Sequence, residues 1–464
     1  MEKYTAYKPS GIKWIGDIPE HWVLINLKRV FSQRFSGTWG EEPKNNSNDR
    51  ICLRVADFDY SNLRFKELPE YTIRNYKDDE ICKYTLSKGS ILIEKSGGGE
   101  KSPVGRSVFY DLKFDNALFA NFLECLVVRD NYNPKFIVYY LSVMYSKRVI
   151  WKYVRQTTGI QNLTLSSLLS MESIYVPNIS EQLSIVAFLE KATANIDAYI
   201  KQTEQEINTL NELKQAEIAN VVTKGLNPNA PMKDSGISWI GEIPEHWECK
   251  RIGSTYIENK HINSDLGCNE AYKFNYGSLV RKDEDVKLEE VADVYSKYTV
   301  ISKNDIIING LNLNYDFVTQ RVAIVEQKGI ITSAYVAITP REEVNSEYFS
   351  YLFKSMDAKK LFNGMGTGIR LTLGFGELKK QQIPIPPKDE QDLIVKNIKA
   401  KTSKIEEYIT TLKSEIAQMQ EYKQRLISDV VTGKVDVRNV AVEKMEDIPE
   451  EEIEETEELE NSEE

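Results

Sequence analysis

The sequence predicts an α+β protein in which two related mixed domains are separated by two long helices. Three observations support this prediction: the chain is long, its segments recur in pairs, and two segments have the apolar spacing of helices that pair. With 464 residues, 41% of them hydrophobic, the chain is long enough to bury more than one core. Its 24 Gly and 15 Pro are ordinary, which excludes collagen-like and wholly disordered classes.

A tandem duplication is the main feature of the chain. The segment SGIKWIGDIPEHW at 10–22 recurs as SGISWIGEIPEHW at 235–247. A longer segment at 175–200 matches 384–409, and both copies continue to the sequence VVT. Each half therefore consists of a short signature segment, a variable block and a long repeated segment. We expect the two halves to share a fold and to be related by a pseudo-twofold axis.

The variable blocks read as mixed α+β domains. A weak echo aligns LSKGSILI at 86–93 with ISKNDIII at 301–308, and the same offset places Arg106 on Arg321. Alternating and β-branched runs broken by Gly, Asn and Asp are typical of strands. We predict strands at Ser90–Glu94, Val104–Tyr110, Leu123–Val128, Asp305–Asn309, Arg321–Val325 and Ser333–Ile338.

The long repeated segments predict two helices that pair with each other. Ser180 and Asp389 are plausible N-caps, and neither segment contains Pro or Gly again until Gly225 and Gly433. Forty helical residues span about 60 Å, and an apolar stripe of that length needs a partner. The stripes comprise Leu189, Ile196, Tyr199, Ile200, Ile207, Leu210, Ile218 and Val221, and Ile398, Ile405, Ile409, Leu412, Ile416, Met419, Ile427 and Val430.

The signature segments carry two tryptophans each, Trp14 with Trp22 and Trp239 with Trp247. Large aromatic residues at close spacing usually pack in a core. We expect these residues to form structural contacts at the entrance of each domain.

The charge is unevenly distributed along the chain. The formal net charge is −11, but residues 443–464 hold 13 acidic residues and one Lys, so the remainder is close to neutral at +1. A nucleic-acid partner would therefore contact local basic patches. The acidic segment has too few apolar residues to fold alone and is expected to be disordered. It reads either as a solubilising tail or as a mimic of DNA.

The sequence lacks the signals of a membrane or secreted protein. No apolar run is long enough to span a bilayer, and the start MEKYTAYKPS has no apolar signal core. The five cysteines form no CxxC pair, and the three histidines share no metal-ligand spacing. We expect a cytoplasmic protein with neither a disulfide framework nor a zinc site.

Catalytic motifs are weak. The run Gly97–Ser102 (GGGEKS) suggests a phosphate loop, but Glu100 stands where the motif requires Gly. One alternative is a metal-dependent nuclease that uses Asp316, Glu326 and Lys328, although such triplets arise by chance in a charged chain. Another alternative is a coiled-coil scaffold that binds without sequence preference.

The combination of motifs resembles one known family. The opening PSGIKWIGDIPEHW, the duplicated block, the long helices that begin with Glu-Gln and the closing VVTGK are similar to those of the specificity subunit of a Type I restriction-modification system. The resemblance covers almost the whole chain and implies two target-recognition domains separated by two antiparallel coiled-coil helices. The implied organisation is domain 1–175, helix 176–225, domain 226–383, helix 384–435 and acidic tail 436–464.

The resemblance also implies partners and cofactors. Each domain would read one half of a split site on double-stranded DNA, and the helices would fix the spacer between the halves. The chain itself would be non-catalytic and hold no cofactor or metal. Two modification subunits would supply S-adenosylmethionine-dependent adenine methylation, and restriction subunits would supply ATP- and magnesium-dependent translocation and cleavage.

Two loops of the first block are candidates for DNA contact. In the loop at 94–106, three glycines allow close backbone approach, while Lys95, Lys101 and Arg106 can reach phosphates or a guanine edge. Near the end of the domain, a Thr-Gly-Ile turn presents Gln161 and Asn162. Solvated loops without a ligand are the alternative reading.

The second block has different side chains at matching places. Asn312, Asn314 and Gln320 are suited to adenine, and Arg321 to phosphate or guanine. The second Thr-Gly-Ile turn presents Arg370. Because the loops differ between the blocks, we expect the two half-sites to differ. Secondary candidates for backbone contacts are Arg148, Arg155, Lys359 and Lys360.

Overall fold

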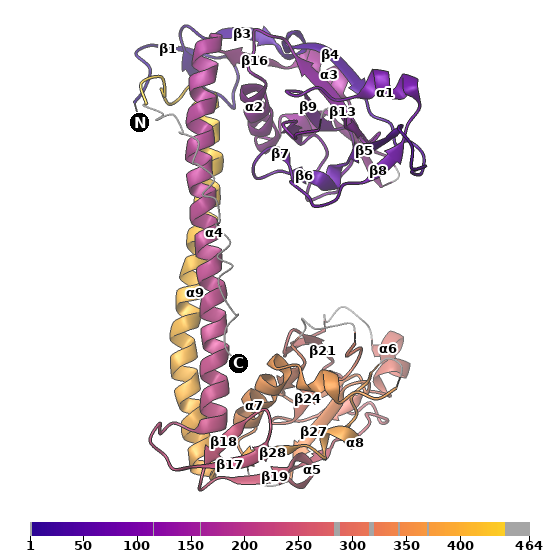
Figure 1. Cartoon of the computed structure of the whole chain (residues 1–464), viewed down its shortest axis with the longest axis vertical. Coiled ribbons are helices and arrows are strands. Elements are labelled where there is room, and N and C mark those ends of the chain that lie inside the picture. Colours follow the sequence, from indigo (N-terminus) through magenta and orange to yellow (C-terminus); the bar gives the residue numbers. More distant parts are fainter. Residues whose placement is uncertain are drawn as a thin grey trace, which may run out of the picture. The chain divides into compact units, whose positions relative to one another are not determined.

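The structure is a computed structural model, and it forms two compact units (Figure 1). Unit 1 comprises Met1–Gln202 with Glu415–Glu464, and unit 2 comprises Thr203–Ser414. Each unit therefore contains one variable block and part of both long helices. The structure describes residues 2–114, 116–157, 159–282, 288–314, 320–341, 344–368 and 371–440.

The main sheet of unit 1 has the strand order β4-β13-β9-β11-β7-β6, with only β7 and β11 parallel. Its central strand is entirely apolar except at its last residue, and Ile91, Leu92 and Ile93 are fully buried. Helix α2 packs beside β11 and fills the core on one face. The strands are β4 (Phe31–Ser36), β6 (Phe58–Asp59), β7 (Arg64–Phe65), β9 (Ile91–Glu94), β11 (Ser107–Phe109) and β13 (Leu123–Val128), with α2 at Pro134–Ser146.

Smaller elements surround this sheet. They form the sheets β1-β2, β3-β16, β12-β5-β8 and β10-β15-β14. Their bounds are β1 (Tyr7–Pro9), β2 (Asp17–Pro19), β3 (Val23–Asn26), β5 (Asp49–Leu53), β8 (Ile73–Asn75), β10 (Ser96–Gly97), β12 (Leu118–Phe119), β14 (Val154–Thr157), β15 (Ile160–Leu163) and β16 (Ser173–Val176), with helices α1 (Asp78–Tyr84) and α3 (Leu165–Met171) and 3-10 turns at Leu27–Val30, Val55–Asp57 and Ile150–Tyr153.

Unit 2 repeats the centre of this fold. Its main sheet has the antiparallel order β20-β27-β24-β25, which corresponds to β4-β13-β9-β11 of unit 1. All six predicted strands are therefore present as central strands of two related sheets, although most begin later than predicted, by three residues at Ser107 and Val336. The main elements are β20 (Tyr256–Glu258), β24 (Ile306–Ile308), β25 (Val322–Ile324), β27 (Val336–Pro340) and α7 (Ser346–Ala358).

The remaining elements of unit 2 form two-stranded sheets and short helices. The sheets pair β17 (Met232–Ile237) with β18 (Gly241–Pro244), β19 (Glu248–Arg251) with β28 (Gln382–Ile385), β21 (Tyr272–Asn275) with β22 (Ser278–Arg281), and β23 (Thr299–Ile301) with β26 (Gly329–Ile331). The helices are α5 (Ile252–Thr255), α6 (Leu288–Tyr295) and α8 (Phe375–Leu378), with a 3-10 turn at Leu361–Gly364.

The two predicted long helices are α4 (Ile179–Lys224) and α9 (Lys388–Val431). Both proposed N-caps are wrong. Helix α4 begins one residue before Ser180, and the side chain of Asn178 accepts a hydrogen bond from the Glu181 amide at 3.0 Å. Helix α9 begins at Lys388, which places Asp389 inside its first turn. In both cases one or two prolines, Pro177 or Pro386 and Pro387, separate the preceding strand from the helix.

Within each unit the two helices run antiparallel. In unit 1, Tyr199 donates to Glu415 at 3.1 Å, and in unit 2, Tyr408 donates to Glu206 at 2.8 Å. Most of the predicted stripe is buried or partly buried, including Leu189, Ile398 and Val430. Tyr199 differs, because its side chain is largely exposed while its hydroxyl contacts the partner helix.

Each signature segment packs on the first turn of a long helix. In unit 1 the buried carboxylate of Glu181 accepts hydrogen bonds from Trp22 Nε1 at 2.9 Å, Tyr4 Oη at 2.7 Å and His21 Nε2 at 2.8 Å. In unit 2, Glu390 binds the corresponding tryptophan and histidine of the second signature. The expectation of structural packing is thus met by Trp22 and Trp247, which are fully buried.

The opposite long helix ends on the same signature segment. Gly433 follows α9 with φ +71°, and a Cβ placed there would lie 2.4 Å from Pro19 Cδ. Gly225 follows α4 with φ +74° and lies against Trp247. Both positions need glycine for the left-handed conformation that ends a helix and for the close approach.

Replacing Gly433 with Ala is expected to destabilise unit 1 by more than the strain of a left-handed alanine, which is about 1–2 kcal/mol. The reason is the added contact with Pro19. Gly16→Ala is a matched control, because Gly16 has φ +81° and open space around its Cβ position. The unfolding of unit 1, followed by amide hydrogen exchange, should separate the two variants. Equal losses of stability in Gly433→Ala and Gly16→Ala would show that the close approach of Gly433 to Pro19 has no effect on stability.

The chain remains packed beyond the predicted end of the second helix. Val437 is buried, Asp436 bridges to Glu2, and the Arg438 guanidinium lies 4.9 Å from the centre of the Tyr4 ring. The segment assigned to the acidic tail, 436–464, therefore begins with ordered residues. The acidic run at 443–464 lies outside the described residues.

Candidate nucleic-acid interface

The structure brings the two candidate loops of each block together, which the sequence did not predict. In unit 1 the Leu163 amide donates to the Lys95 carbonyl at 2.8 Å. In unit 2 the Leu373 amide donates to the Gly310 carbonyl at 2.9 Å. The two units thus present a paired-loop surface built by the same backbone contact, with different side chains on it.

In unit 1 the pairing forms the small sheet β10-β15-β14. Ser96 lies opposite Asn162, which lies opposite Arg155. Asn162 and Arg155 are exposed, and Ser96 Oγ donates to Asn162 Oδ1 at 2.7 Å. This row places a cation, an amide and a hydroxyl side by side, which is a polar surface suited to a nucleic-acid backbone or base edge.

The other predicted residues of this surface have different environments. Lys101 is exposed near the tip of the loop, beside the bridge between Gly99 and Ser102. Lys95 is half-buried and donates to Ser36 Oγ at 2.9 Å.

Gln161, predicted to be presented to DNA by a turn, is instead buried. Its side chain is only 6% exposed, and its Oε1 accepts a hydrogen bond from the Val104 amide at 3.3 Å. Alternation along β15 turns Gln161 inward and Asn162 outward. Gln161 therefore supports the glycine loop through its hydrogen bond with the Val104 amide.

Arg106 is half-buried in a polar cluster. Its Nε and Nη2 bind the carboxylate of Glu94 at 2.9 and 2.8 Å, and its guanidinium carbon lies 3.7 Å from the centre of the Tyr60 ring. Burial alone would lower the pKa of Arg106, but the hydrogen bond and the attraction of Glu94 raise it. The side chain keeps its charge and one orientation.

Arg321, at the matching position of unit 2, points inward. It is only 1% exposed, and its Nη1 donates to the carbonyls of Asn309 at 3.0 Å and Leu311 at 2.8 Å. Its amide donates to Asp357 at 2.7 Å. The prediction that Arg321 contacts DNA directly does not fit this burial, and the residue instead supports the loop.

The other predicted residues of unit 2 divide between surface and interior. Asn312 is exposed with φ +52°, and Gln320 is exposed beside Gly277. Asn314 is half-buried, and its Oδ1 has no hydrogen-bond partner among the described residues. Arg370 lies outside the described residues, as does Asp316 of the nuclease alternative.

Among the secondary candidates, two cations lie over tryptophan rings. Arg148 is 4.9 Å from the ring centre of Trp151, and Lys359 is 5.9 Å from that of Trp239. Sequence reasoning missed Arg34 on the edge strand β4, which is exposed and contacts Ser166 at 2.9 Å. Phe31 and Phe35, aromatic residues of a type that favours strands, are the signal that could have indicated the strand at 31–36.

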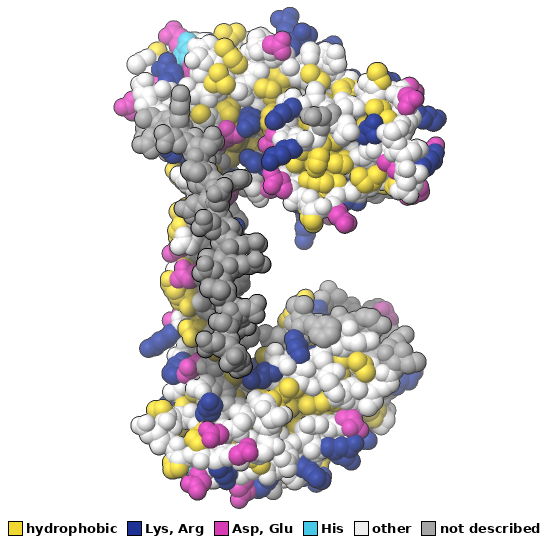
Figure 2. All heavy atoms as spheres, viewed as in Figure 1, with side chains coloured by type: hydrophobic (Ala, Val, Ile, Leu, Met, Phe, Trp, Pro, Cys, Tyr) yellow, Lys and Arg dark blue, Asp and Glu magenta, His cyan; other side chains and the backbone are white. Residues whose placement is uncertain are grey.

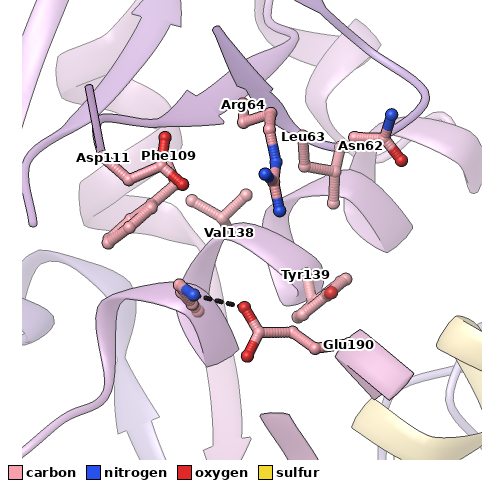
Figure 3. A pocket seen from close by; sticks show the side chains of 9 residues that line it. Asn62, Leu63, Arg64, Phe109, Asp111, Val138, Tyr139 and Glu190 are labelled. Atoms are coloured by element: carbon pink, nitrogen blue, oxygen red, sulfur yellow. Dashed lines mark hydrogen bonds and ion pairs between the residues drawn. The ribbon is translucent and has the colours of Figure 1, made fainter. Parts of the chain in front are cut away.

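A pocket in unit 1 lies beside the β6–β7 turn, α2 and α4 (Figure 3). Lys135 forms an ion pair with Glu190 there, and Arg64 and Asp111 also line the pocket. Two acidic and two basic side chains leave little net charge, so the pocket does not favour an anion such as DNA. Figure 2 likewise shows Lys and Arg side chains distributed over unit 1 among acidic and apolar ones.

The described part of the chain offers little support for the nuclease alternative. Within it, no group of three or more His, Cys, Asp or Glu residues is placed to hold a metal ion. Glu326 and Lys328 are both exposed. None of the described helices is long and apolar enough to cross a membrane.

Comparison with known proteins connects this architecture to one family. A family model described as the Type I restriction modification DNA specificity domain matches residues 19–209 and again 244–418. The putative type I restriction enzyme MjaX specificity subunit of Methanocaldococcus jannaschii is 25% identical over 449 residues, covering 93% of this chain and 98% of the relative. The MjaVIII specificity subunit of the same organism is 23% identical over 58% of this chain and 63% of the relative.

A solved structure supports the fold. A chain from work on complex assembly and conformational transition of the type I R-M system has a TM-score of 0.63 at 12% identity, covering 90% of this chain and 99% of that chain. The two family-model matches together span more than half of the sequence and coincide with the two repeated units. The chain therefore belongs to the family of Type I restriction-modification DNA specificity proteins.

Proposed function

We propose that the chain is the DNA-recognition subunit of a Type I restriction-modification complex and binds a split site with a fixed spacer. The observation that carries this proposal is the paired-loop surface, which occurs once in each unit with the same backbone contact and different side chains. One scaffold used twice with different exposed residues is what two unlike half-sites require. The chain provides recognition and is not an enzyme.

The exposed residues suggest how recognition is divided. Lys101 and Arg155 in unit 1 are suited to phosphates, which position the protein, while Asn162 is suited to a base edge. In unit 2, Asn312 and Gln320 are the exposed amides, and an amide can form two hydrogen bonds with adenine. Lys95, Asn314 and Arg370 remain proposed contacts.

The proposal extends to the partners. Two modification subunits would carry S-adenosylmethionine, and restriction subunits would carry ATP and magnesium, with no cofactor bound by this chain. The complex would act in the cytoplasm, where its DNA substrate lies. The domain limits 1–175 and 226–383 likewise remain predictions.

The proposal predicts different effects for Lys101→Ala and Asn162→Ala. Loss of a phosphate contact should weaken binding to all sequences and reduce the salt slope by about one, whereas loss of a base contact should cost about 1–3 kcal/mol and relax one position. Binding of the complex with its modification subunits is measured across salt concentrations and a panel of substituted sites. Lys13→Ala, at an exposed lysine of the signature segment, is the control.

A specific outcome would contradict the proposal. If wild-type protein with its modification subunits bound random DNA as tightly as any genomic site, the chain would be the non-specific scaffold. The candidate sites are found by mapping methylated adenines in the host genome.

A further inference from the structure

A buried cluster beside the first paired-loop surface joins three side chains from separate elements. Glu94 ends β9, Arg106 immediately precedes β11, and Tyr60 lies in the turn after β6. Glu94 is 2% exposed and receives hydrogen bonds from Arg106 Nε and Nη2, from the Arg106 amide at 3.3 Å and from the Tyr60 hydroxyl. A buried carboxylate with this many donors fixes the arginine firmly.

The cluster constrains the guanidinium from two directions. The Glu94 carboxylate binds one edge, and the Tyr60 ring covers one face at 3.7 Å. Burial and then the hydrogen bond to Glu94 raise the pKa of Tyr60, so its hydroxyl remains a donor. The entropic cost of ordering this arginine is therefore already met before any ligand binds.

One end of the guanidinium remains available. An arginine has five N–H donors, and Glu94 accepts from only Nε and Nη2. Nη1 has no hydrogen-bond partner among the described residues and is not a buried unsatisfied atom, and the side chain is 25% exposed. Glu94 therefore fixes the Nε–Nη2 edge of the guanidinium, and Nη1 remains available to a ligand.

In unit 2 the matching position carries an amide in place of the Glu94 carboxylate. The position that matches Glu94 is Asn309, and the matching arginine, Arg321, is buried and donates to the carbonyls of Asn309 and Leu311. The same backbone contact occurs in both units, since the amides of Glu94 and Asn309 donate to the carbonyls of Arg106 and Arg321. Where this position is Glu94, Arg106 is partly exposed, and where it is Asn309, Arg321 is buried.

We infer that Glu94 and Tyr60 are positioning residues that hold Arg106 to read a guanine in the first half-site. The inference rests on the proposed function. Guanine is the chosen base because its O6 and N7 accept two parallel N–H donors in the major groove, the commonest specific contact of arginine. The residue pair 94/106 would thereby determine one base of the recognised sequence.

The test uses the complete complex with its modification subunits and a panel of sites substituted at each position of the first half-site. Arg106→Ala should lower discrimination at a single G·C pair by roughly 10-fold to 100-fold. Glu94→Gln and Glu94→Asn should cause much of the same loss at the same pair. Tyr60→Phe, which keeps the ring but removes the hydroxyl, should cause a smaller loss.

Double variants separate positioning from a general structural effect. If Glu94 acts through Arg106, Glu94→Gln added to Arg106→Ala should cause no further loss of discrimination. Asp57→Asn is the matched control, since Asp57 is a buried carboxylate paired with Arg54 in the same unit. It should alter stability without changing the preference for any base.

Two outcomes would overturn the inference. Equal weakening on every sequence would make Arg106 a phosphate contact or a structural residue, and additive losses in the double variant would show that Glu94 acts independently. Failure of the proposed function looks different, because the wild-type complex would then show no sequence preference at all.

Discussion

Removal of one heptad from each long helix, residues 203–209 of α4 and 405–411 of α9, is expected to shorten the spacer between the half-sites by about three base pairs. Seven helical residues span about 10 Å, and DNA rises about 3.4 Å per base pair. The half-site sequences should not change, because the paired-loop surfaces lie outside the deleted segments. The measurement is methylation by the complex on a library of sites that differ only in spacer length.

The two segments were chosen because they lie at matching heights of the antiparallel pair. The hydrogen bond from Tyr408 to Glu206 joins the two segments themselves, and that from Tyr199 to Glu415 lies just outside them; both pairs follow one antiparallel register. A whole heptad from each helix preserves the phase of the apolar stripe. Deletion from α4 alone is the control and should disrupt the pairing. An unaltered spacer with intact activity would refute the role of helix length.

Trp22→Ala is expected to cost unit 1 about 3–5 kcal/mol of unfolding free energy. The indole is fully buried, packs edge-on against Phe136 and donates to Glu181 at 2.9 Å. Its removal leaves a cavity where the start of α4, the end of α9 and the signature segment meet, and takes one donor from a buried carboxylate. The effect should therefore exceed that of any loop substitution proposed above.

The measurement must resolve the two units, because a two-unit chain need not unfold in a single step. Amide hydrogen exchange of β3 and β16 reports on unit 1, and that of β19 and β28 reports on unit 2. We expect the loss in unit 1. Trp39→Ala serves as the control, since Trp39 is 41% exposed and its ring lies beside the Arg74 guanidinium, and it should cost below about 1 kcal/mol. Similar losses for both variants would contradict the structural role of Trp22.

The repeated and varied parts of the chain have separate tasks. Glu181 with Trp22 and Glu390 with Trp247 form the same junction in both units. The loops beside β10 and after β24 differ in side chains while keeping one backbone contact. Stability therefore depends on the parts that repeat, and recognition is proposed for the parts that vary.

The sequence by itself determined the duplication, the central strands and the two paired helices. These features follow from local spacing, since apolar residues at intervals of two or of three and four indicate strands and helices wherever they occur. The tryptophans of both signatures were likewise predicted to be structural, and Trp22 and Trp247 are buried. The helix starts were less accurate, because Asn178 takes the cap that Ser180 was expected to provide.

Only the tertiary structure decided where the candidate side chains point. Arg106 and Arg321 occupy matching positions of the repeat, yet one is held by Glu94 near the surface and the other is buried among carbonyls. Gln161 and Asn162 are neighbours on one strand with opposite exposure. A side chain's direction depends on partners distant in sequence, such as Tyr60 for Arg106, and local spacing carries no information about those partners.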